Sequence, residues 1–218
     1  MANTEIRDRL GAILAKELHG FDYDRPRSRL VQISPAGWKG IALDVMSREL
    51  GKKSLSLAAE LRINRLADRF LPHSPGLKPQ EIKKTFPILY VNCANFMHSD
   101  FLYSFNTDEA SIQGVASHFA EGIRNEVIPF LEKYFDEATL VESFLDDDST
   151  AWVTSNPKTR YTVLLSHFAL RGDWDAFDKY AKEWEAFCQT PFGMMYKQDA
   201  SSIISGMRSD GYRDHQTP

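Results

Sequence analysis

The sequence has 218 residues, of which 43% are hydrophobic and 12% aromatic, so it can bury a substantial core. This composition disfavours a disordered chain, and no run approaches the roughly 18 uncharged apolar residues that a membrane span requires. The N-terminal residues alternate charged with apolar side chains and lack the apolar core of a signal peptide. We therefore expect one soluble domain, residues 1–218, in the cytoplasm, without a membrane partner.

The net charge of −4 is distributed unevenly along the chain. Residues 1–85 carry 16 Lys or Arg against 10 Asp or Glu, whereas residues 86–218 carry 10 against 20. The strongest excess lies in residues 107–148, where eleven acids face two bases, Arg124 and Lys133. The acids are Asp108, Glu109, Glu121, Glu126, Glu132, Asp136, Glu137, Glu142, Asp146, Asp147 and Asp148. This segment is a candidate acidic surface.

The first element predicted is an amphipathic helix, capped by Asn3 or Thr4 and ended by Gly20. Its buried stripe comprises Ile6, Leu10, Ile13, Leu14 and Leu18. Residues 22–28 are interpreted as a connector, because they are rich in charge and interrupted by Pro26.

A run of strands follows the connector. Residues 30–33 and 41–45 flank the turn residues 34–37 and predict a hairpin. Residues 54–63 alternate apolar with polar side chains, which predicts a strand with one covered face and one wetter face, passing into a short helix over 64–70. A helical interpretation of 57–70 competes with it. After a loop over 73–79, strands are predicted at 86–92 and 101–105.

From Thr107 onward the pattern is helical, and Pro129 is expected to kink or divide the first helix. A shorter helix follows Asp136. Asn156 caps another, and Gly172 and Asp173 join it to a further helix, giving a helical hairpin. The aromatic stripe of that second helix is interpreted as core. A short helix is predicted over 199–207, with 209–218 frayed.

This order of elements predicts an α+β fold in which an antiparallel sheet of about five strands is covered by helices. Residues 1–106 supply the N-terminal helix and the sheet, and residues 107–208 supply a helical layer.

Motifs that carry catalysis, phosphate binding or metal binding are absent from the sequence, so no cofactor or metal is expected. Cys93 and Cys188 are expected to be buried thiols. His98 and Asp100 form one pair that could act as an oriented base. His118 and His167 could meet as ligands, but partly buried histidines with satisfied hydrogen bonds are the preferred interpretation.

Two further groups of charged residues could in principle bind ions or phosphates, but another interpretation is preferred for each. Asp146, Asp147 and Asp148 lack the spacing of a calcium loop and predict a solvated loop. Arginines at two places could grip phosphates if they were adjacent in space. These are Arg25, Arg27, Arg29, Arg62, Arg65 and Arg69. Nucleic-acid binding is nevertheless disfavoured by the overall acidity of the chain, with a pI near 5.9.

The chain resembles a loosely defined set of bacterial immunity-like proteins of unknown function. The matching features are His19, Gly20 and Phe21 after the leading helix, the strand run over 29–63, and the helix with Trp174, Phe177 and Trp184. The resemblance has no diagnostic motif and implies no functional residue. It implies a protein that blocks a toxin by binding it.

Together with the charge distribution, the resemblance leads to our main hypothesis, a non-catalytic protein-binding module that docks an acidic helical surface on a basic partner. The residues expected to form that surface are Glu121, Glu126, Glu132, Asp136, Glu137, Glu142, Asp146, Asp147 and Asp148. One alternative is a hydrolase or transferase with a dispersed site near His98 and Asp100. Another is a homo-oligomer paired through the helical hairpin.

Overall fold

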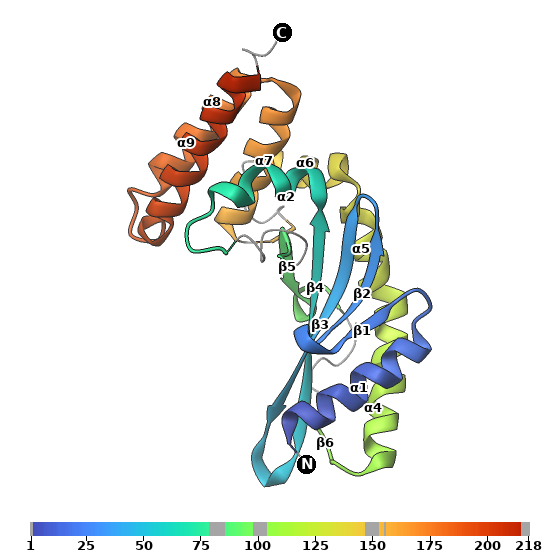
Figure 1. The fold of residues 1–218 in the computed structure, drawn as a ribbon. Coiled ribbons are helices and arrows are strands. Elements are labelled where there is room, and N and C mark those ends of the chain that lie inside the picture. The colour runs from blue at the N-terminus through green and yellow to red at the C-terminus, as the bar shows by residue number, and fades with distance from the viewer. Residues whose placement is uncertain (1, 79–85, 98–103, 147–152, 155, 215–218) are drawn as a thin grey trace. The chain divides into compact units, whose positions relative to one another are not determined.

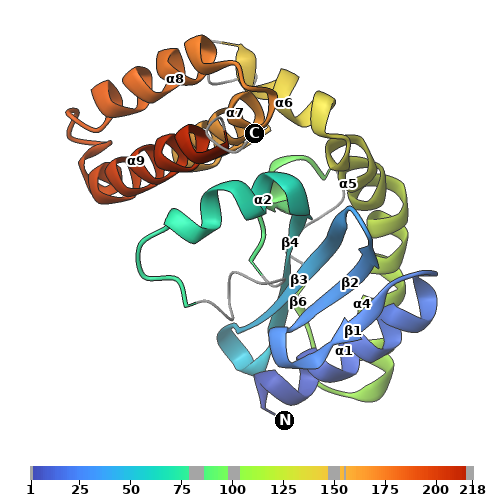
Figure 2. The same cartoon turned by 45° about the horizontal axis from the view of Figure 1, so that its top comes forward.

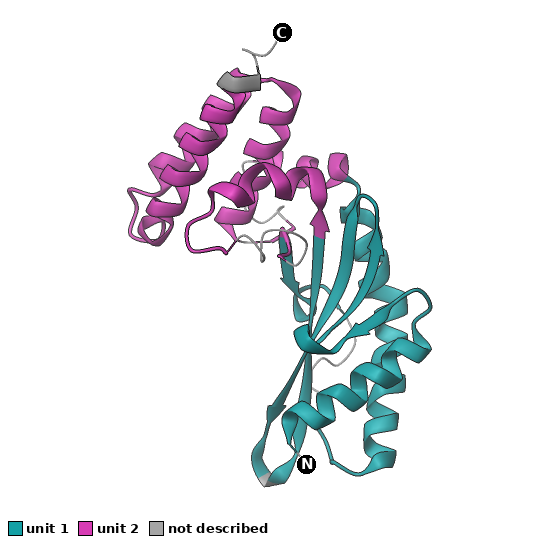
Figure 3. Ribbon diagram, in the orientation of Figure 1, with its two compact units in different colours: residues 1–61, 89–136 teal, residues 62–88, 137–218 magenta. Residues whose placement is uncertain are grey.

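A computed structural model describes residues 2–78, 86–97, 104–146, 153–154 and 156–214 (Figure 1). The chain forms two compact units, one comprising Met1–Leu61 and Leu89–Asp136 and the other Arg62–Ile88 and Glu137–Pro218 (Figure 3). The expected α+β class is confirmed, with an antiparallel sheet in the first half and helices throughout the second. The prediction of a single domain stays a prediction.

The sheet of the first unit is built from consecutive antiparallel strands. Its order is β1 (Asp22–Asp24), β2 (Arg29–Ser34), β3 (Gly37–Ser47), β4 (Lys53–Ile63) and β5 (Leu89–Asn92), and β6 (Ser104–Phe105) also pairs with β4. The hairpin of β2 and β3 and the strand predicted over 54–63 are confirmed. Short helical turns, η2 (Glu49–Gly51) and η4 (Cys93–Asn95), connect strands at the sheet's ends.

Three predictions about strands need correction. The connector over 22–28 contains β1, a strand too short to show alternation, followed by the 3-10 turn η1 (Arg25–Arg27). The strand predicted at 86–92 begins only at Leu89. Of the strand predicted at 101–105, residues 104 and 105 form β6, and residues 101–103 lie outside the described residues.

β4 is buried on both faces, so the predicted wetter face is wrong. On the face predicted to be wetter, Ser54, Ala58, Glu60 and Arg62 are buried and Ser56 is half-buried. β4 lies between β3 and β5, and the side chain of Arg29 from β2 reaches Glu60. A charged residue in a strand therefore does not mark a solvent-exposed position when another strand supplies the opposite charge.

The helices of the first unit are α1 (Asn3–Glu17), α4 (Glu109–Gly122) and α5 (Ile128–Phe135). α1 packs on α4 and on β1 to β3, and Figures 1 and 2 show α1 and α4 on the same side of the sheet. The apolar stripe of α1 is buried as predicted, apart from Ile13, which is half-buried. The predicted cap is wrong, because Ala2 precedes the first turn and no side chain caps it.

A π-helical segment, η5 (Ile123–Val127), joins α4 to α5. Pro129 is the second residue of α5 and has no backbone N–H to donate into the helix. The expected disturbance at Pro129 is therefore a widened turn just before it, within a helical run that continues.

The second unit contains helices from both of its chain segments: α2 (Asn64–Phe70), η3 (Leu71–His73), α6 (Glu137–Leu145), α7 (Pro157–Arg171), α8 (Trp174–Phe187), η7 (Met194–Tyr196) and α9 (Lys197–Asp214). The predicted junctions are confirmed, since Asn156 caps α7, Gly172 adopts a left-handed conformation after it, and Asp173 caps α8. α2 begins and ends where the sequence predicts. α9 packs against α7, α8 and α2.

The prediction of a short helix over 199–207 and a frayed tail over 209–218 is wrong for residues 209–214, which continue α9. Two glycines that weaken a helical pattern here allow close packing instead. A Cβ on Gly206 would lie 2.2 Å from the His73 ring, and one on Gly211 would lie 2.1 Å from the Trp174 ring. His73 also lies 2.8 Å from the carboxylate of Asp210. Residues 215–218 lie outside the described residues.

Among the described residues, no helix combines the length and the apolar character needed to span a bilayer.

Two helical glycines of the first unit provide a matched test of the packing of α1. A Cβ on Gly11 would lie 2.3 Å from the Tyr23 ring, whereas one on Gly114 of α4 would meet nothing within 4 Å. We expect Gly11→Ala to lower the free energy of unfolding by about 2 kcal/mol through overpacking. Gly114→Ala should raise it by roughly 0.5–1 kcal/mol through helix propensity. Urea denaturation measures both, and a stable Gly11→Ala variant would contradict the packing.

Candidate functional site

The predicted acidic surface is divided between the two units. The described members in the first unit are Glu121, Glu126, Glu132 and Asp136, and those in the second unit are Glu137, Glu142 and Asp146. Asp147 and Asp148 lie outside the described residues. In the first unit, exposed Arg124 and Lys133 lie on the same helical run, so this surface carries mixed charge.

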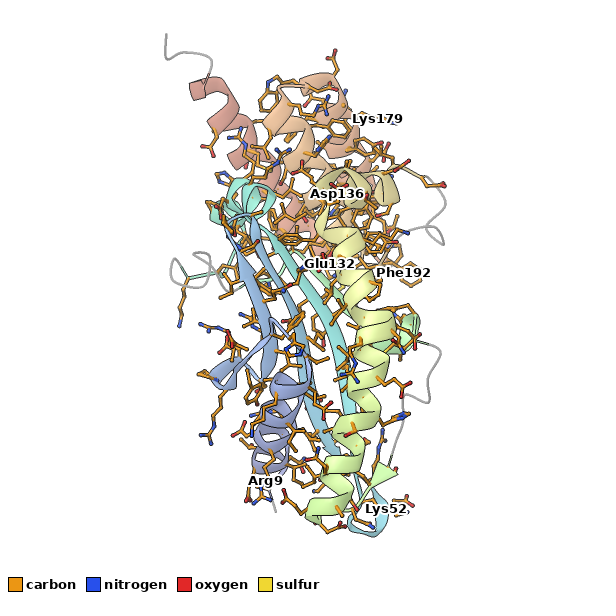
Figure 4. The ribbon with its side chains drawn as sticks, turned by 90° about the vertical axis from the view of Figure 1, so that its right-hand side faces the viewer. Arg9, Lys52, Glu132, Asp136, Lys179 and Phe192 are labelled. Carbon is orange, nitrogen blue, oxygen red and sulfur yellow. The ribbon has the colours of Figure 1, made fainter. Side chains whose placement is uncertain are left out.

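Two of these carboxylates are engaged within their own unit. Glu132, marked with Asp136 in Figure 4, forms an ion pair with Lys39 of β3. Glu137 accepts a hydrogen bond of 2.6 Å from Arg65 and lies 2.9 Å from Nδ1 of His167. Burial acts to raise the pKa of Glu137, but the hydrogen bonds and charges of Arg65 and His167 outweigh burial and lower it. Glu121, Asp136, Glu142 and Asp146 are exposed, and Glu126 is half-buried.

The expectation of a partly buried, hydrogen-bonded histidine is confirmed for His167 and wrong for His118, which is exposed. His167 is bound to Glu137 in the second unit, and His118 is exposed on α4 of the first unit. His98 and Asp100 lie outside the described residues, so the site proposed there stays a prediction. Among the described residues, no group of three or more His, Cys, Asp or Glu is close enough together to hold a metal ion.

Five of the six arginines suggested as phosphate contacts bind carboxylates of their own unit. The pairs are Arg25 with Asp8 at 2.7 Å, Arg27 with Asp24 at 3.0 Å, Arg29 with Glu60 at 3.3 Å, Arg62 with Asp68 at 2.5 Å, and Arg65 with Glu137. These arginines are therefore neutralised by carboxylates of the same unit, which favours a structural role for them.

The register of the strands defines a second surface, which we call the polar face of the sheet. Tyr23 lies opposite Leu30, and its ring packs against Gly11, so this side of the sheet is covered by α1. Alternate residues of the same strands, Asp24 and Arg29, therefore point to the other side. We define the polar face by the residues on that side that carry polar, aromatic or exposed side chains. They are Asp22, Asp24, Arg29, Ile33, Trp38, Asp44, Ser54, Ser56, Glu60, Arg62, Tyr90 and Asn92.

At the centre of the polar face lies a buried guanidinium. Arg29 is 3.3 Å from Glu60 and 3.5 Å from Asp24, and its guanidinium lies 4.1 Å from the centre of the Trp38 ring. Gly40 lets that ring approach the sheet, since a Cβ there would lie 3.1 Å from it. Burial raises the pKa of Glu60 even though the charge and hydrogen bond of Arg29 act to lower it.

Beside this cluster, Tyr90 lies opposite Glu60 in the paired strands β4 and β5, and 58% of its surface is exposed. Partial burial and then the negative charges of Glu60 and Asp44 raise the pKa of the Tyr90 phenol. Asp44 and Asn92 are exposed. An accessible aromatic ring surrounded by carboxylates attracts cationic groups, because both the ring face and the carboxylates favour positive charge.

The thiols of the chain are poorly suited to nucleophilic chemistry. Cys93 and Cys188 are free and buried, as expected. Burial raises the pKa of Cys93 to about 12 and also raises that of Cys188. Both side chains are therefore protonated at neutral pH, whereas a nucleophilic cysteine needs a lowered pKa.

Two open hollows of the first unit lie elsewhere. One, of about 590 Å³, lies over α1 beside Tyr23 and Arg25, both of which bind the Asp8 carboxylate. Burial and the Asp8 hydrogen bond raise the pKa of Tyr23 to about 12, so this phenol is also neutral. The other, of about 420 Å³, lies between Lys52 and the start of α4. The titratable groups of the first hollow are bound to one another, and neither hollow shows an activated nucleophile.

Comparisons with known proteins identify no relative: no family model, curated protein or solved structure matches the chain.

Sequence reasoning missed the polar face, because its residues come from five strands and only the strand register brings them together. The alternation of Arg25, Arg27 and Arg29 was a partial signal of this face, because Arg29 is the first residue of β2 and its cation lies on that face.

Replacing Arg29 tests the charge balance of the polar face. In Arg29→Met, the buried Glu60 loses its cation, and we expect the free energy of unfolding to fall by about 3 kcal/mol at pH 7. The pKa of Glu60 is already raised in the folded protein, and loss of Arg29 raises it further. The folded variant therefore gains stability from protonation as the pH falls, and its deficit relative to wild type should shrink at pH 5.

Urea denaturation of both proteins at the two pH values measures this difference. Arg27→Met serves as control, because Arg27 is about half exposed, and its loss should cost less than about 1 kcal/mol. A deficit of Arg29→Met that is equal at pH 7 and pH 5 would show that Glu60 does not depend on Arg29.

Proposed function

We propose that this chain is a non-catalytic protein-binding module whose polar face receives basic side chains of a partner protein. The observation that carries the proposal is the exposed Tyr90 ring, which lies in the field of the Asp44 and Glu60 carboxylates. A lysine or arginine laid on this ring would gain the attraction of the π-electrons and of Asp44, since Arg29 offsets much of the charge of Glu60.

The surroundings of Tyr90 suit a binding surface. Tyrosine is among the residues that most often dominate the binding energy of protein interfaces. Asn92, two residues along β5, is exposed on the same face, and its side-chain oxygen accepts a hydrogen bond from the Ala94 amide at 3.0 Å. Ile33, which is 77% exposed, adds an apolar side chain at the β2–β3 turn. The strands that hold these residues are paired in register, so little order has to be gained on binding.

Several features favour binding over catalysis. The pKa values of Cys93, Cys188 and Tyr90 are all raised, which keeps these groups in their unreactive protonated forms at neutral pH. Glu60, the buried acid, is tied to Arg29. An enzyme built around His98 and Asp100 remains the alternative, and it would have to draw on residues outside those described.

The acidic helical surface is the competing docking site for the same basic partner. Its exposed members Glu121 and Glu142 lie in different units and carry no ion pair among the described residues. If the partner is a toxin, as the resemblance to immunity-like proteins implies, binding would block it by occupancy, and long-range attraction would speed association.

A tetra-arginine peptide provides a direct test of the polar face. Titrated into the ¹⁵N-labelled full-length chain at low salt, it should shift the amide signals of Tyr90 and Asn92, and the shifts should fade as salt is added. Asp44→Lys should weaken this binding about five-fold, equivalent to roughly 1 kcal/mol, because it replaces an attraction with a repulsion. Tyr90→Ala should weaken it to a similar extent.

Glu121→Lys is the matched control, since it makes the same change of charge on α4. Binding that survives Asp44→Lys and fails in Glu121→Lys would transfer the docking site to the helical surface. If neither substitution changes the affinity for the peptide, the proposal is wrong. A native partner recovered at low salt and released by salt should show the same ranking of variants.

A further inference from the structure

Glu60 is a buried carboxylate that lies directly opposite the exposed Tyr90. The two residues face each other in the paired strands β4 and β5, where the Cβ atoms of opposing residues are about 5 Å apart. Glu60 is 9% exposed, whereas Tyr90 is 58% exposed. A change of charge on Glu60 therefore acts on the Tyr90 ring from within the sheet, where water and salt screen it poorly.

The Arg29 guanidinium that offsets the charge of Glu60 is held in place by further contacts. It lies 3.5 Å from the Asp24 carboxylate and 4.1 Å from the centre of the Trp38 ring. These contacts keep Arg29 where it is when Glu60 loses its charge. Asp24 is also 3.0 Å from Arg27, so it cannot balance Arg29 alone. Protonation of Glu60 therefore leaves a cation on the polar face with one anion fewer.

We propose that docking of a basic side chain on Tyr90 is coupled to the ionisation of Glu60, so that the polar face binds its partner more tightly at neutral pH than in mild acid. The coupling rests on the proposed function, because it regulates the same site. While Glu60 is ionised, it offsets the charge of Arg29, and exposed Asp44 attracts the incoming cation. Once Glu60 is protonated, the fixed Arg29 repels that cation.

The surroundings of Glu60 bring its protonation into the range of mild acid. Burial raises the pKa of this carboxyl above its ordinary value, although the charge and hydrogen bond of Arg29 act to lower it. A protonated carboxyl keeps an oxygen that can accept the hydrogen bond of Arg29, which is 3.3 Å long. The strands can therefore stay paired while the charge of the site changes.

The other charged or titratable groups of the polar face come from all five strands. They are Asp22 and Asp24 of β1, Arg29 of β2, Asp44 of β3, Arg62 of β4 and Tyr90 of β5. The arginines stay cationic at these pH values, and the raised pKa of Tyr90 keeps its phenol neutral. Glu60 is the most deeply buried of the four carboxyls, so its charge loses the most hydration.

Coupling between a proton and a ligand is reciprocal. If protonation of Glu60 weakens binding of the cation, a bound cation must lower the pKa of Glu60 by stabilising its ionised form. The coupling can therefore be measured in the unaltered protein from the titration of Glu60 alone.

The test titrates the full-length wild-type chain with tetra-arginine that is acetylated and amidated at its ends. This peptide keeps its charge at every pH used, so any pH dependence of its affinity comes from the protein. At constant low salt, the affinity should fall about two-fold from pH 7 to pH 5. The side-chain carboxyl carbon of Glu60, followed by ¹³C NMR, should titrate at a lower pH with the peptide bound than without it.

Glu60→Gln removes the titrating group. This variant should bind the peptide about two-fold more weakly than wild type at pH 7 and lose most of the pH dependence. Glu121→Gln is the matched control, because it removes an exposed carboxyl of α4, and it should keep the affinity and pH profile of wild type. If Glu60→Gln does not fold, the titration of Glu60 in the wild-type chain decides.

The possible outcomes separate the coupling from the proposed function. Peptide binding at pH 7 together with a Glu60 titration that the peptide leaves unchanged would overturn the coupling and leave the proposed function in place. The same pH dependence in Glu60→Gln as in wild type would assign the effect to another carboxyl and would also overturn the coupling. A peptide that does not bind at pH 7 would overturn both.

Discussion

The buried Arg29 guanidinium constrains how the strands of the first unit pair. A charge removed from water is costly unless ion pairs and hydrogen bonds replace its hydration. Asp24 from β1, Glu60 from β4 and the Trp38 ring from β3 surround it. A shift of β1, β3 or β4 by one residue would turn its contribution to the other face and remove one of the partners of the cation. The cluster therefore favours one register across four strands.

The same cluster shapes the surface beside it. Arg29 offsets much of the charge of Glu60, while Asp44, farther along β3, remains exposed. The region around Tyr90 is therefore negative without being a dense patch of like charge, which would destabilise the fold by repulsion. The same side chains therefore stabilise the sheet and give the region around Tyr90 its attraction for a cationic group.

Local patterns predicted the elements whose signals are short-range. The helix over 64–70, the β2–β3 hairpin and the junction at Gly172 and Asp173 each depend on neighbours within a few residues. The charge distribution was less informative about the surface, because acidic residues pair with distant bases. Glu132 binds Lys39, 93 positions away in the sequence, and Glu137 binds Arg65, 72 positions away. The end of α9 was missed because Gly211 resembles a helix breaker until the Trp174 ring that packs on it is known.

The widened turn at η5 also sets the rotational phase of the helical run. A π-helical segment accommodates one residue more than an α-helix of equal length, and one residue corresponds to about 100° of rotation. Side chains before Ile123 and after Val127 therefore do not follow one straight stripe, and Glu121 and Glu132 need not form a single ridge. The segment thus holds one residue more than a regular helix would. Removal of that residue would rotate all of α5 by that angle, carrying buried Leu131 toward water and Glu132 away from Lys39.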